Sequence, residues 1–468
     1  MPDFSVIAQT PTVRAIVQDG LLERVFHNAL FPRLMFRGEA VPQKWPGNVG
    51  DTMVFTGEGL IPPDASPLIP GQDPDTATAP FEQWTAQIQQ YGKPAIDTAM
   101  PTDAVALGKL FLSNARRLGL AASQAINRAV RDRMYNAAES GWTVVDGPFA
   151  GVATIRVKRL NGLTRARNPN LANGAQVKFD LVSTNNPLSV SIFDNGAAAT
   201  FSIIAFQADT PGDETGPGTI TLSGNVTNVL DRAFVKTIDR SDLVLVGGGN
   251  KVDDVGSTDV PTFTDVRSCL TNLQQNNVPV HPDGRYHCHM SPVTQARLYD
   301  TAEFQRLNTA LPDYYYYRQY ALGEFMGILF LNNTECPQST TVVGGSTATF
   351  DQRDPFAPEL FNNGNAATGT PLFRALFTGQ GGIYEYWMDQ DALITEAGLN
   401  GKVGQPSISN NGIEVLSERI KLIIRAPIDR LQQIVSMAWS LFADWPVRTD
   451  AATGDAARYK RFVSLVHA

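Results

Sequence analysis

The sequence predicts an α+β fold that is rich in strands and contains one long helix. From Thr102 to Glu139 the apolar residues recur at steps of three and four, which places them on one face of a helix. Before this helix, two alternating runs flank a proline-rich segment, as in a long hairpin. After it, short alternating runs between residues 166 and 260 predict a β-rich domain.

The long helix should bury a single apolar stripe. At 1.5 Å per residue it would be roughly 55 Å long, which exceeds the diameter of a small domain. We therefore expect it to brace an extended molecule. The stripe consists of Leu107, Leu110, Phe111, Leu118, Ala122, Ile126, Val130 and Met134.

The same helix carries an excess of arginines. One interpretation is a solvated face that forms salt bridges with other subunits. The other is a diffuse positive face that contacts phosphates without reading sequence. We prefer subunit contacts, and the candidates for them are Arg116, Arg117, Arg128 and Arg131.

The segments before the helix predict contacts with other molecules. Residues 1–45 have an aromatic, proline-bearing end and should form an arm. Residues 46–101 contain two strand-like runs around a tip rich in proline. A two-stranded hairpin is marginally stable alone, so we expect it to lie on a neighbouring molecule. Its candidate contact residues are Phe55, Phe81 and Trp84.

The chain beyond residue 260 alternates between helical and strand patterns. Helices are predicted at residues 263–275 and 292–299, and a strand at residues 286–290 lies between them. Further strands are expected near residues 328–331, 372–376, 382–387, 419–424, 434–441 and 461–466. We expect the last part of the chain, which contains the strands near 434–441 and 461–466, to pair with strands near the long helix.

Composition excludes several classes of protein. Among 468 residues, the net charge of -8 lacks the basic footprint of a sequence-specific DNA-binding protein. The odd number of cysteines, Cys269, Cys288 and Cys336, indicates reduced thiols in a cytosolic assembly. The sequence has neither an apolar run long enough to span a bilayer nor a secretory amino terminus, so no membrane contact is expected.

The motifs that resemble catalytic or metal sites have simpler interpretations. The run Gly247–Lys251 lacks the spacing of a phosphate-binding loop and predicts a turn. The cluster of His281, His287, His289 and Cys288 lacks further ligands at recognised spacing, so strand packing is preferred to metal binding. No Gly-x-Ser-x-Gly elbow is present. We predict no catalytic, cofactor-binding or metal-binding residue.

Two other features suggest carbohydrate chemistry without requiring it. Carboxylate pairs such as Asp351 with Asp354, and Asp389 with Asp391, occur outside any pattern of a glycosidase barrel. The run of tyrosines at residues 314–317 could stack on a sugar, but four consecutive aromatic residues cannot face one pocket. We prefer a loop that packs on another subunit, with Tyr314 and Tyr315 as candidates.

Taken in order, these parts resemble the major capsid proteins of tailed double-stranded DNA bacteriophages, which have the Hong Kong 97-type fold. The sequences of residues 286–292, 298–300 and 323–328 are similar to a strand, a helix and a glycine-bounded turn that are common in these capsid proteins. The resemblance implies hexamers and pentamers that form an icosahedral capsid around DNA. It also implies that the β-rich block is an inserted β-barrel domain.

The resemblance assigns a role to each segment. Residues 1–45 would be the amino-terminal arm, 46–101 the extended loop, and 102–152 the peripheral domain with its spine helix. Residues 153–165 and 261–400 would form the axial domain around an insertion at 166–260, and 401–468 would supply closing strands of the peripheral domain.

The resemblance also implies partners and a location. A separate scaffold protein, a portal and a cement protein are expected, with non-specific contact to packaged DNA. No Lys and Asn pair for covalent cross-linking is evident, so we expect a shell without isopeptide bonds. Assembly would occur in the cytoplasm of the bacterial host and yield the virion capsid. Alternatives are a secreted or surface carbohydrate-binding β-sandwich protein and, less favoured, a glycoside hydrolase.

Overall fold

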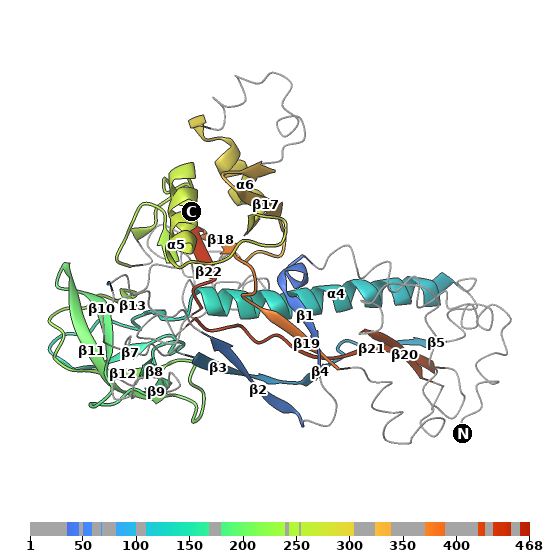
Figure 1. The fold of residues 1–468 in the computed structure, drawn as a ribbon, viewed down its shortest axis with the longest axis horizontal. Coiled ribbons are helices and arrows are strands. Elements are labelled where there is room, and N and C mark those ends of the chain that lie inside the picture. Colours follow the sequence, from blue (N-terminus) through green and yellow to red (C-terminus); the bar gives the residue numbers. More distant parts are fainter. Residues whose placement is uncertain are drawn as a thin grey trace. The chain divides into compact units, whose positions relative to one another are not determined.

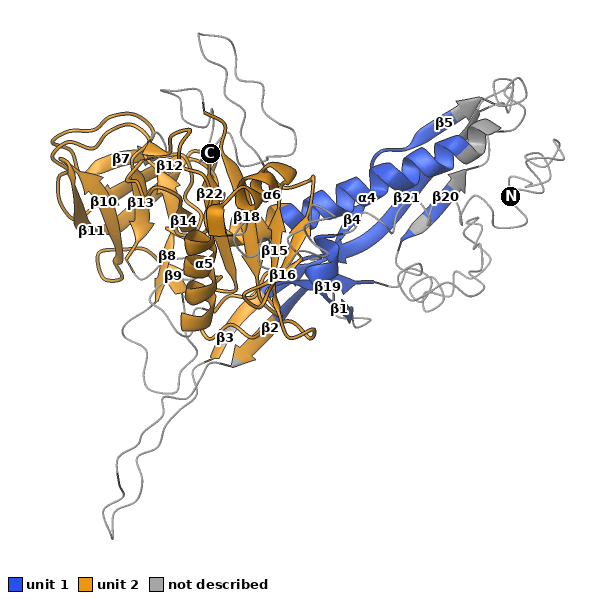
Figure 2. Ribbon diagram, turned by 90° about the horizontal axis from the view of Figure 1, so that it is seen from above, with its two compact units in different colours: residues 1–54, 85–131, 383–446 blue, residues 55–84, 132–382, 447–468 orange. Residues whose placement is uncertain are grey.

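The computed structural model describes residues 35–45, 50–58, 67, 81–99, 109–167, 179–238, 243–251, 254–303, 323–337, 370–388, 420–425, 434–450 and 459–468 (Figure 1). The chain forms two compact units (Figure 2). Unit 1 comprises residues 1–54, 85–131 and 383–446, and unit 2 comprises residues 55–84, 132–382 and 447–468. The mixture of helices and strands agrees with the predicted α+β class.

Unit 1 contains a six-stranded sheet built around one long strand, β21 (Ile434–Asp444). One half of β21 pairs with β5 (Ile96–Ala99) and β20 (Lys421–Arg425), and the other half pairs with β4 (Gln89–Tyr91) and β19 (Tyr384–Trp387). The short strand β1 (Val41–Lys44) adds in parallel to β19. The predicted strands at 419–424 and 434–441 therefore exist and share a sheet.

The long helix α4 (Lys109–Ala138) lies within the range that the sequence predicts. Both ribbon views show its unit 1 part running along the sheet that contains β21 (Figures 1 and 2). The stripe residues Leu118, Ala122, Ile126, Val130 and Met134 are all fully buried, as predicted. Residues 102–108, where the helix was predicted to begin, lie outside the described residues. The boundary between the units falls within α4, after Arg131.

The buried stripe is accompanied by one polar anchor. Asn127 lies next to the stripe and is 1% exposed. Its side-chain oxygen accepts a hydrogen bond from the backbone nitrogen of Phe36 at 2.8 Å. Phe36 precedes the short 3-10 helix η3 (Arg37–Glu39), and the Arg37 guanidinium donates to Glu385 at 3.0 Å. These buried bonds fasten the segment before β1 inside unit 1.

Unit 2 contains a closed β-barrel. Its strands follow the order β6 (Trp142–Val144), β13 (Phe234–Thr237), β10 (Leu188–Asp194), β11 (Ala197–Ala208), β12 (Gly218–Leu222) and β7 (Thr154–Val157). Beyond the end of β6, Val145 forms an antiparallel bridge with Val157, the last residue of β7. The backbone bonds Asp146 N to Arg156 O and Lys158 N to Val144 O join the first and last strands.

The interior of the barrel is apolar because alternate residues of each strand face it. Val190, Ile192, Ile203, Ile220 and Val235 are all fully buried in one cluster. The strands differ from the predicted segment, since β6 and β7 come before residue 166. The sequence indicated a strand at residues 153–157 but assigned it to the axial domain, because a strand pattern does not show which strand it pairs with. Between β7 and β10 in the chain, β8 (Arg165–Arg167) and β9 (Phe179–Leu181) form a separate two-stranded sheet.

The second sheet of unit 2 has the order β14 (Leu243–Leu245), β22 (Phe462–His467), β18 (Phe373–Thr378), β15 (Tyr286–Met290), β17 (Ile328–Asn332) and β16 (Glu324–Phe325). Helix α5 (Phe263–Gln275) packs on β22 and β14, and α6 (Pro292–Tyr299) contacts β18. The predicted ranges of α5, β15 and α6 are confirmed at both ends.

Local chemistry explains why the sequence located these helices well. Asp265 accepts a hydrogen bond from the backbone nitrogen of Thr262, the residue before α5, at 2.9 Å. Ser291 caps α6 by accepting from the nitrogen of Thr294 at 3.1 Å, and Pro292 occupies the first turn. Such caps are visible in sequence.

The expectation that the end of the chain pairs near the long helix holds for β21, which pairs with β4 and β5, and is wrong for β22. β22 was expected to pair near the long helix, but it pairs with β14 in parallel and with β18 in an antiparallel arrangement. Strand β19, expected in the same domain as β18, instead joins the sheet of unit 1. An alternating apolar pattern identifies a strand but not its partner, because partners are selected by packing between distant segments.

Candidate assembly surfaces

The predicted hairpin is present as paired strands β2 (Thr52–Glu58) and β3 (Phe81–Gln87). Within the described residues, this two-stranded sheet is joined to no other strand. The rings of Phe55 and Trp84 stack across the two strands at 6.3 Å, and the Arg448 guanidinium lies 5.7 Å from the Trp84 ring. Val54 is 52% exposed, and Phe55 and Phe81 are partly exposed. The residues between the strands lie almost entirely outside the described part.

The candidate arginines of α4 occupy different environments. Arg116 and Arg117 are exposed, and Arg128 is partly exposed. Arg131 differs because its side chain is 1% exposed within the single chain. Arg131 is therefore part of the protein interior. Of the four arginines, only Arg116, Arg117 and Arg128 have exposed surface that a second molecule could contact. Tyr314 and Tyr315 lie outside the described residues.

The histidine cluster contains two stacked rings. His281 and His287 lie 4.0 Å apart between ring centroids, with planes 4° apart. His281 Nε2 lies 3.3 Å from Thr378 Oγ1, and His287 Nε2 lies 2.9 Å from Asp283 Oδ2. Burial acts to raise the pKa of Asp283, but its bonds with His287 and the Arg285 backbone outweigh this and lower the pKa. The cluster is thus held by ordinary hydrogen bonds.

The cysteines lie in the protein interior. Cys269, Cys288 and Cys336 are free thiols and all are buried. Burial raises the pKa of the Cys269 and Cys288 thiols well above the ordinary value. Such thiols are poor nucleophiles and poor metal ligands because the reactive form is the thiolate.

The glycine run at residues 247–249 forms a turn, as predicted. It follows β14, and Asp254 Oδ2 accepts hydrogen bonds from the backbone nitrogens of Asn250 at 2.8 Å and Lys251 at 3.2 Å. These two backbone N–H groups, which a phosphate would need as donors, therefore already donate to a carboxylate. Both carboxylate pairs considered for a glycosidase, at residues 351–354 and 389–391, lie outside the described residues.

A buried ion network in unit 2 was not predicted from the sequence. Glu139 follows the last turn of α4, and its Oε1 accepts from Arg374 Nη1 at 2.6 Å. Its Oε2 lies 3.6 Å from Arg159 Nη1. Arg159 also donates to the side chain of Asn136. All three charged side chains are at least 98% buried. The only sequence signal is an arginine inside the apolar strand 373–378.

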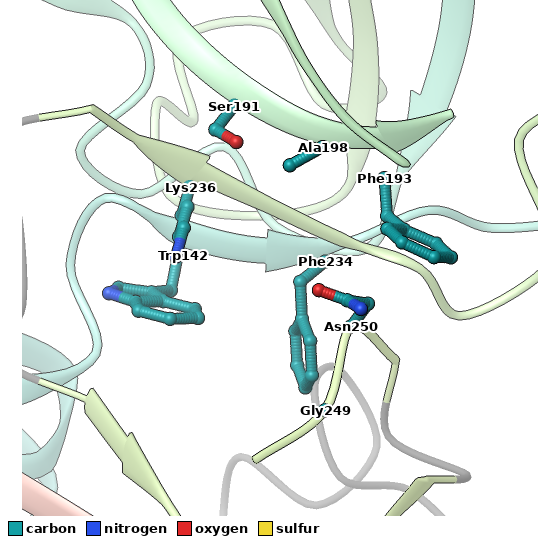
Figure 3. A pocket seen from close by; sticks show the side chains of 8 residues that line it. All are labelled: Trp142, Ser191, Phe193, Ala198, Phe234, Lys236, Gly249 and Asn250. Atoms are coloured by element: carbon teal, nitrogen blue, oxygen red, sulfur yellow. The ribbon is translucent and has the colours of Figure 1, made fainter. Parts of the chain in front are cut away.

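A small cavity lies on the outside of the barrel (Figure 3). Its volume is about 50 Å³. Pockets for small molecules are typically several hundred Å³, so this cavity admits only a group of side-chain size. The lining residues are Trp142, Ser191, Phe193, Ala198, Phe234, Lys236, Gly249 and Asn250.

The described helices contain no segment that is both long and apolar enough to cross a membrane. No protein-family model and no curated protein matches the chain.

Solved phage capsids resemble this chain along most of its length. The capsid of Ralstonia phage GP4 is 12% identical with a TM-score of 0.48, covering 94% of this chain and 92% of that one. The capsid of cyanophage Pam1 is 9% identical with a TM-score of 0.45, covering 92% and 88%. That of cyanophage P-SCSP1u is 11% identical with a TM-score of 0.43, covering 94% and 88%.

Proposed function

We propose that this chain is the major capsid protein of a tailed double-stranded DNA bacteriophage. Copies of it would assemble as hexamers and pentamers into an icosahedral shell that encloses the genome. The observation that carries the proposal is the β2–β3 hairpin, whose strands pair with no other described strand and leave Val54 half exposed. An isolated two-stranded hairpin is marginally stable, so a neighbouring copy is the surface that would complete it.

The long helix supports the same role. Its stripe is fully buried from Leu118 to Met134, while Arg116 and Arg117 remain exposed on the same element. One rigid rod therefore offers a packed face to its own chain and charged groups to others. Capsid assembly needs this combination because one chain must meet several neighbours through large interfaces while its own core stays constant.

The small size of the described cavity also favours a structural role. The cavity outside the barrel is about 50 Å³, too small for a substrate or an organic cofactor. His281 lies within hydrogen-bond distance of the Thr378 hydroxyl and His287 of Asp283, which also accepts from the Arg285 backbone. We propose no catalytic activity.

The proposed partners and the proposed place of assembly are those expected for a capsid protein of this family. A separate scaffold protein, a portal and a cement protein are proposed partners, and contact with packaged DNA is proposed to be non-specific. The net charge of -8 supports the last point, because a negatively charged chain repels DNA phosphates and so limits adhesion of the genome. The proposed site of assembly is the cytoplasm of the bacterial host.

The barrel gives little support to the alternative that the chain binds carbohydrate. Such a module presents aromatic rings as an exposed platform, whereas Trp142 and Phe234 on its outer side are each only 6% exposed. These rings instead join a buried cluster with Leu243 and Val466 of the neighbouring sheet.

Shortening the hairpin tests the proposal. Deleting residues 62–80 leaves three residues between the ends of β2 and β3, a length that hairpins tolerate. We expect the deleted chain to keep the circular dichroism spectrum of the parent but to lose assembly, measured by sedimentation velocity. The matched control replaces the same residues with a Gly and Ser linker of equal length, which separates the loss of loop contacts from strain. Normal assembly by both variants would contradict the role given to the hairpin.

A further inference from the structure

The cavity outside the barrel combines aromatic walls with one cation, and the four neighbouring strands β6, β13, β10 and β11 build it together with the glycine turn. Lys236 of β13 is directly opposite Ser191 of β10 on one side and Trp142 of β6 on the other. Alternate residues of a strand share a face, so Phe234 and Phe193 lie on this same outer side. The backbone nitrogen of Phe234 donates to Asn250 O at 2.9 Å, which fixes the glycine turn at the rim. Figure 3 shows these side chains around the cavity.

Lys236 provides the charge of this cavity, which we call the Lys236 pocket. Its ammonium lies 5.4 Å from the centroid of the Trp142 ring, a cation–π distance. The side chain is partly buried. In the described part of the chain, no carboxylate lies within ion-pair distance of it. By contrast, Lys158 of the same barrel lies 3.6 Å from Asp146.

The size and chemistry of the pocket define what would fill it. About 50 Å³ excludes a cofactor but admits a short side chain. A partly desolvated ammonium favours an anion, and the hydroxyl of Ser191 and the amide of Asn250 at the rim can donate hydrogen bonds to it. The rings of Phe193 and Phe234 would contact a methylene stem. An aspartate or glutamate side chain meets all of these conditions.

We propose that the Lys236 pocket receives an aspartate or glutamate side chain from a second copy of this chain. The inference rests on the proposed function, because only an assembly brings copies together. The chain has 46 acidic and 38 basic residues and a net charge of -8, so a second copy is a negatively charged partner for the Lys236 ammonium. Water screens the attraction between two charges less when aromatic walls surround the ion pair than when the pair is exposed.

Cross-linking in assembled protein tests this contact directly. Equal amounts of ¹⁴N-labelled and ¹⁵N-labelled full-length protein are assembled together and treated with a carbodiimide, which joins lysines to adjacent carboxylates without a spacer. Mass spectrometry of the digest then shows whether the Lys236 peptide is joined to an acidic peptide of the other isotope. We expect a mixed-isotope cross-link at Lys236. A link within one isotope only, or none at Lys236 while other lysines react, would overturn the proposal.

A pair of substitutions tests the energetic role. Lys236→Met removes the charge but keeps an apolar stem over Trp142, and Lys236→Arg keeps the charge. The matched control is Lys158→Met, which removes one positive charge from the same barrel. We expect Lys236→Met to raise the protein concentration needed for association about fivefold, with Lys236→Arg and the control near the parent.

The outcomes also separate this inference from the proposed function. If the parent protein never associates, the capsid proposal fails. If shells form equally well from Lys236→Met, only the Lys236 pocket contact is wrong. If Lys236 cross-links only after a different protein is added, the occupant is that protein and the assignment to a second copy is wrong.

Discussion

Glu139 and Arg374 form a buried ion pair that joins the end of the long helix to strand β18. Glu139 Oε1 lies 2.6 Å from Arg374 Nη1, and their side chains are 0% and 1% exposed. Arg374 also lies 5.5 Å from the centroid of the Tyr135 ring, one turn earlier on α4. The carboxylate of Glu139 serves Arg159 as well. One acidic side chain therefore balances two buried guanidinium groups.

Removing that carboxylate should be costly. Glu139→Gln keeps the volume of the side chain but removes the negative charge that it supplies to two buried guanidinium groups. We expect a loss of about 3–5 kcal/mol in the free energy of unfolding, measured with chemical denaturant. The control is Asp209→Asn, which breaks the exposed pair with Arg156 at 2.6 Å and should cost less than about 1 kcal/mol. Equal losses in the two variants would show that burial of the Glu139 network adds nothing.

The imidazole of His467 should make stability fall in mild acid. Burial lowers the pKa of His467 from 6.5 to about 4, and nearby Arg297 acts in the same direction. Between these pH values the unfolded chain binds a proton that the folded chain does not bind. Stability is therefore complete above pH 6.5 and is lost progressively as the pH falls towards about 4, by about 3 kcal/mol.

Comparing unfolding curves at several pH values checks this prediction. His467→Asn retains a group that can bond Thr294 Oγ1, which lies 2.8 Å from His467 Nε2 in the parent. The variant should be less stable than the parent at pH 7, and its stability should vary less between pH 6.5 and 4. Parallel pH profiles would show that another group titrates in this range.

The barrel should require its two early strands. A fragment of residues 165–260 lacks β6 and β7 and leaves β13 and β12 as unpaired edges. A fragment of residues 141–260 restores the closing bridge between Val145 and Val157. We expect the shorter fragment to aggregate or remain unfolded and the longer one to give a dispersed NMR spectrum of a β domain. A folded shorter fragment would mean that closure is dispensable.

The two faces of α4 should respond differently to substitution. Ile126→Ala opens a cavity in the fully buried stripe and should cost about 2–5 kcal/mol of unfolding free energy. The double substitution Arg116→Glu and Arg117→Glu alters only exposed residues and should leave stability within about 0.5 kcal/mol.

The same double substitution distinguishes the two interpretations of these arginines. If they contact other subunits, it should weaken assembly of shells in the absence of DNA. If they contact phosphates, assembly should proceed normally, and the salt-dependent affinity for DNA should fall instead. Sedimentation velocity and a DNA titration at two salt concentrations separate these outcomes.

The sequence predicted elements better than it predicted their partners. α5, β15 and α6 match their expected ranges because the caps at Asp265 and Ser291 and the apolar periods are local signals. The pairing of β22 with β18, and the use of β6 and β7 in the barrel, depend on contacts between residues far apart in the chain. Periodicity carries no information about such contacts.

The candidate surfaces were predictable to a similar degree. Alternation placed Phe55 and Trp84 on facing strands, and the structure stacks their rings. The arginine pattern marked Arg116 and Arg117, which are exposed, but it could not show that Arg131 is buried. Glu139, Arg159 and Arg374 were missed because 235 positions separate Glu139 from Arg374 in the sequence.

The most direct test of the capsid proposal is the size of the particles that the purified chain forms, alone or with a candidate scaffold protein. Electron microscopy of negatively stained samples, supported by light scattering, should show closed icosahedral shells or capsomers of several hundred kilodaltons. A species that stays at 50.8 kDa, the mass of one chain, under every assembly condition would contradict the account.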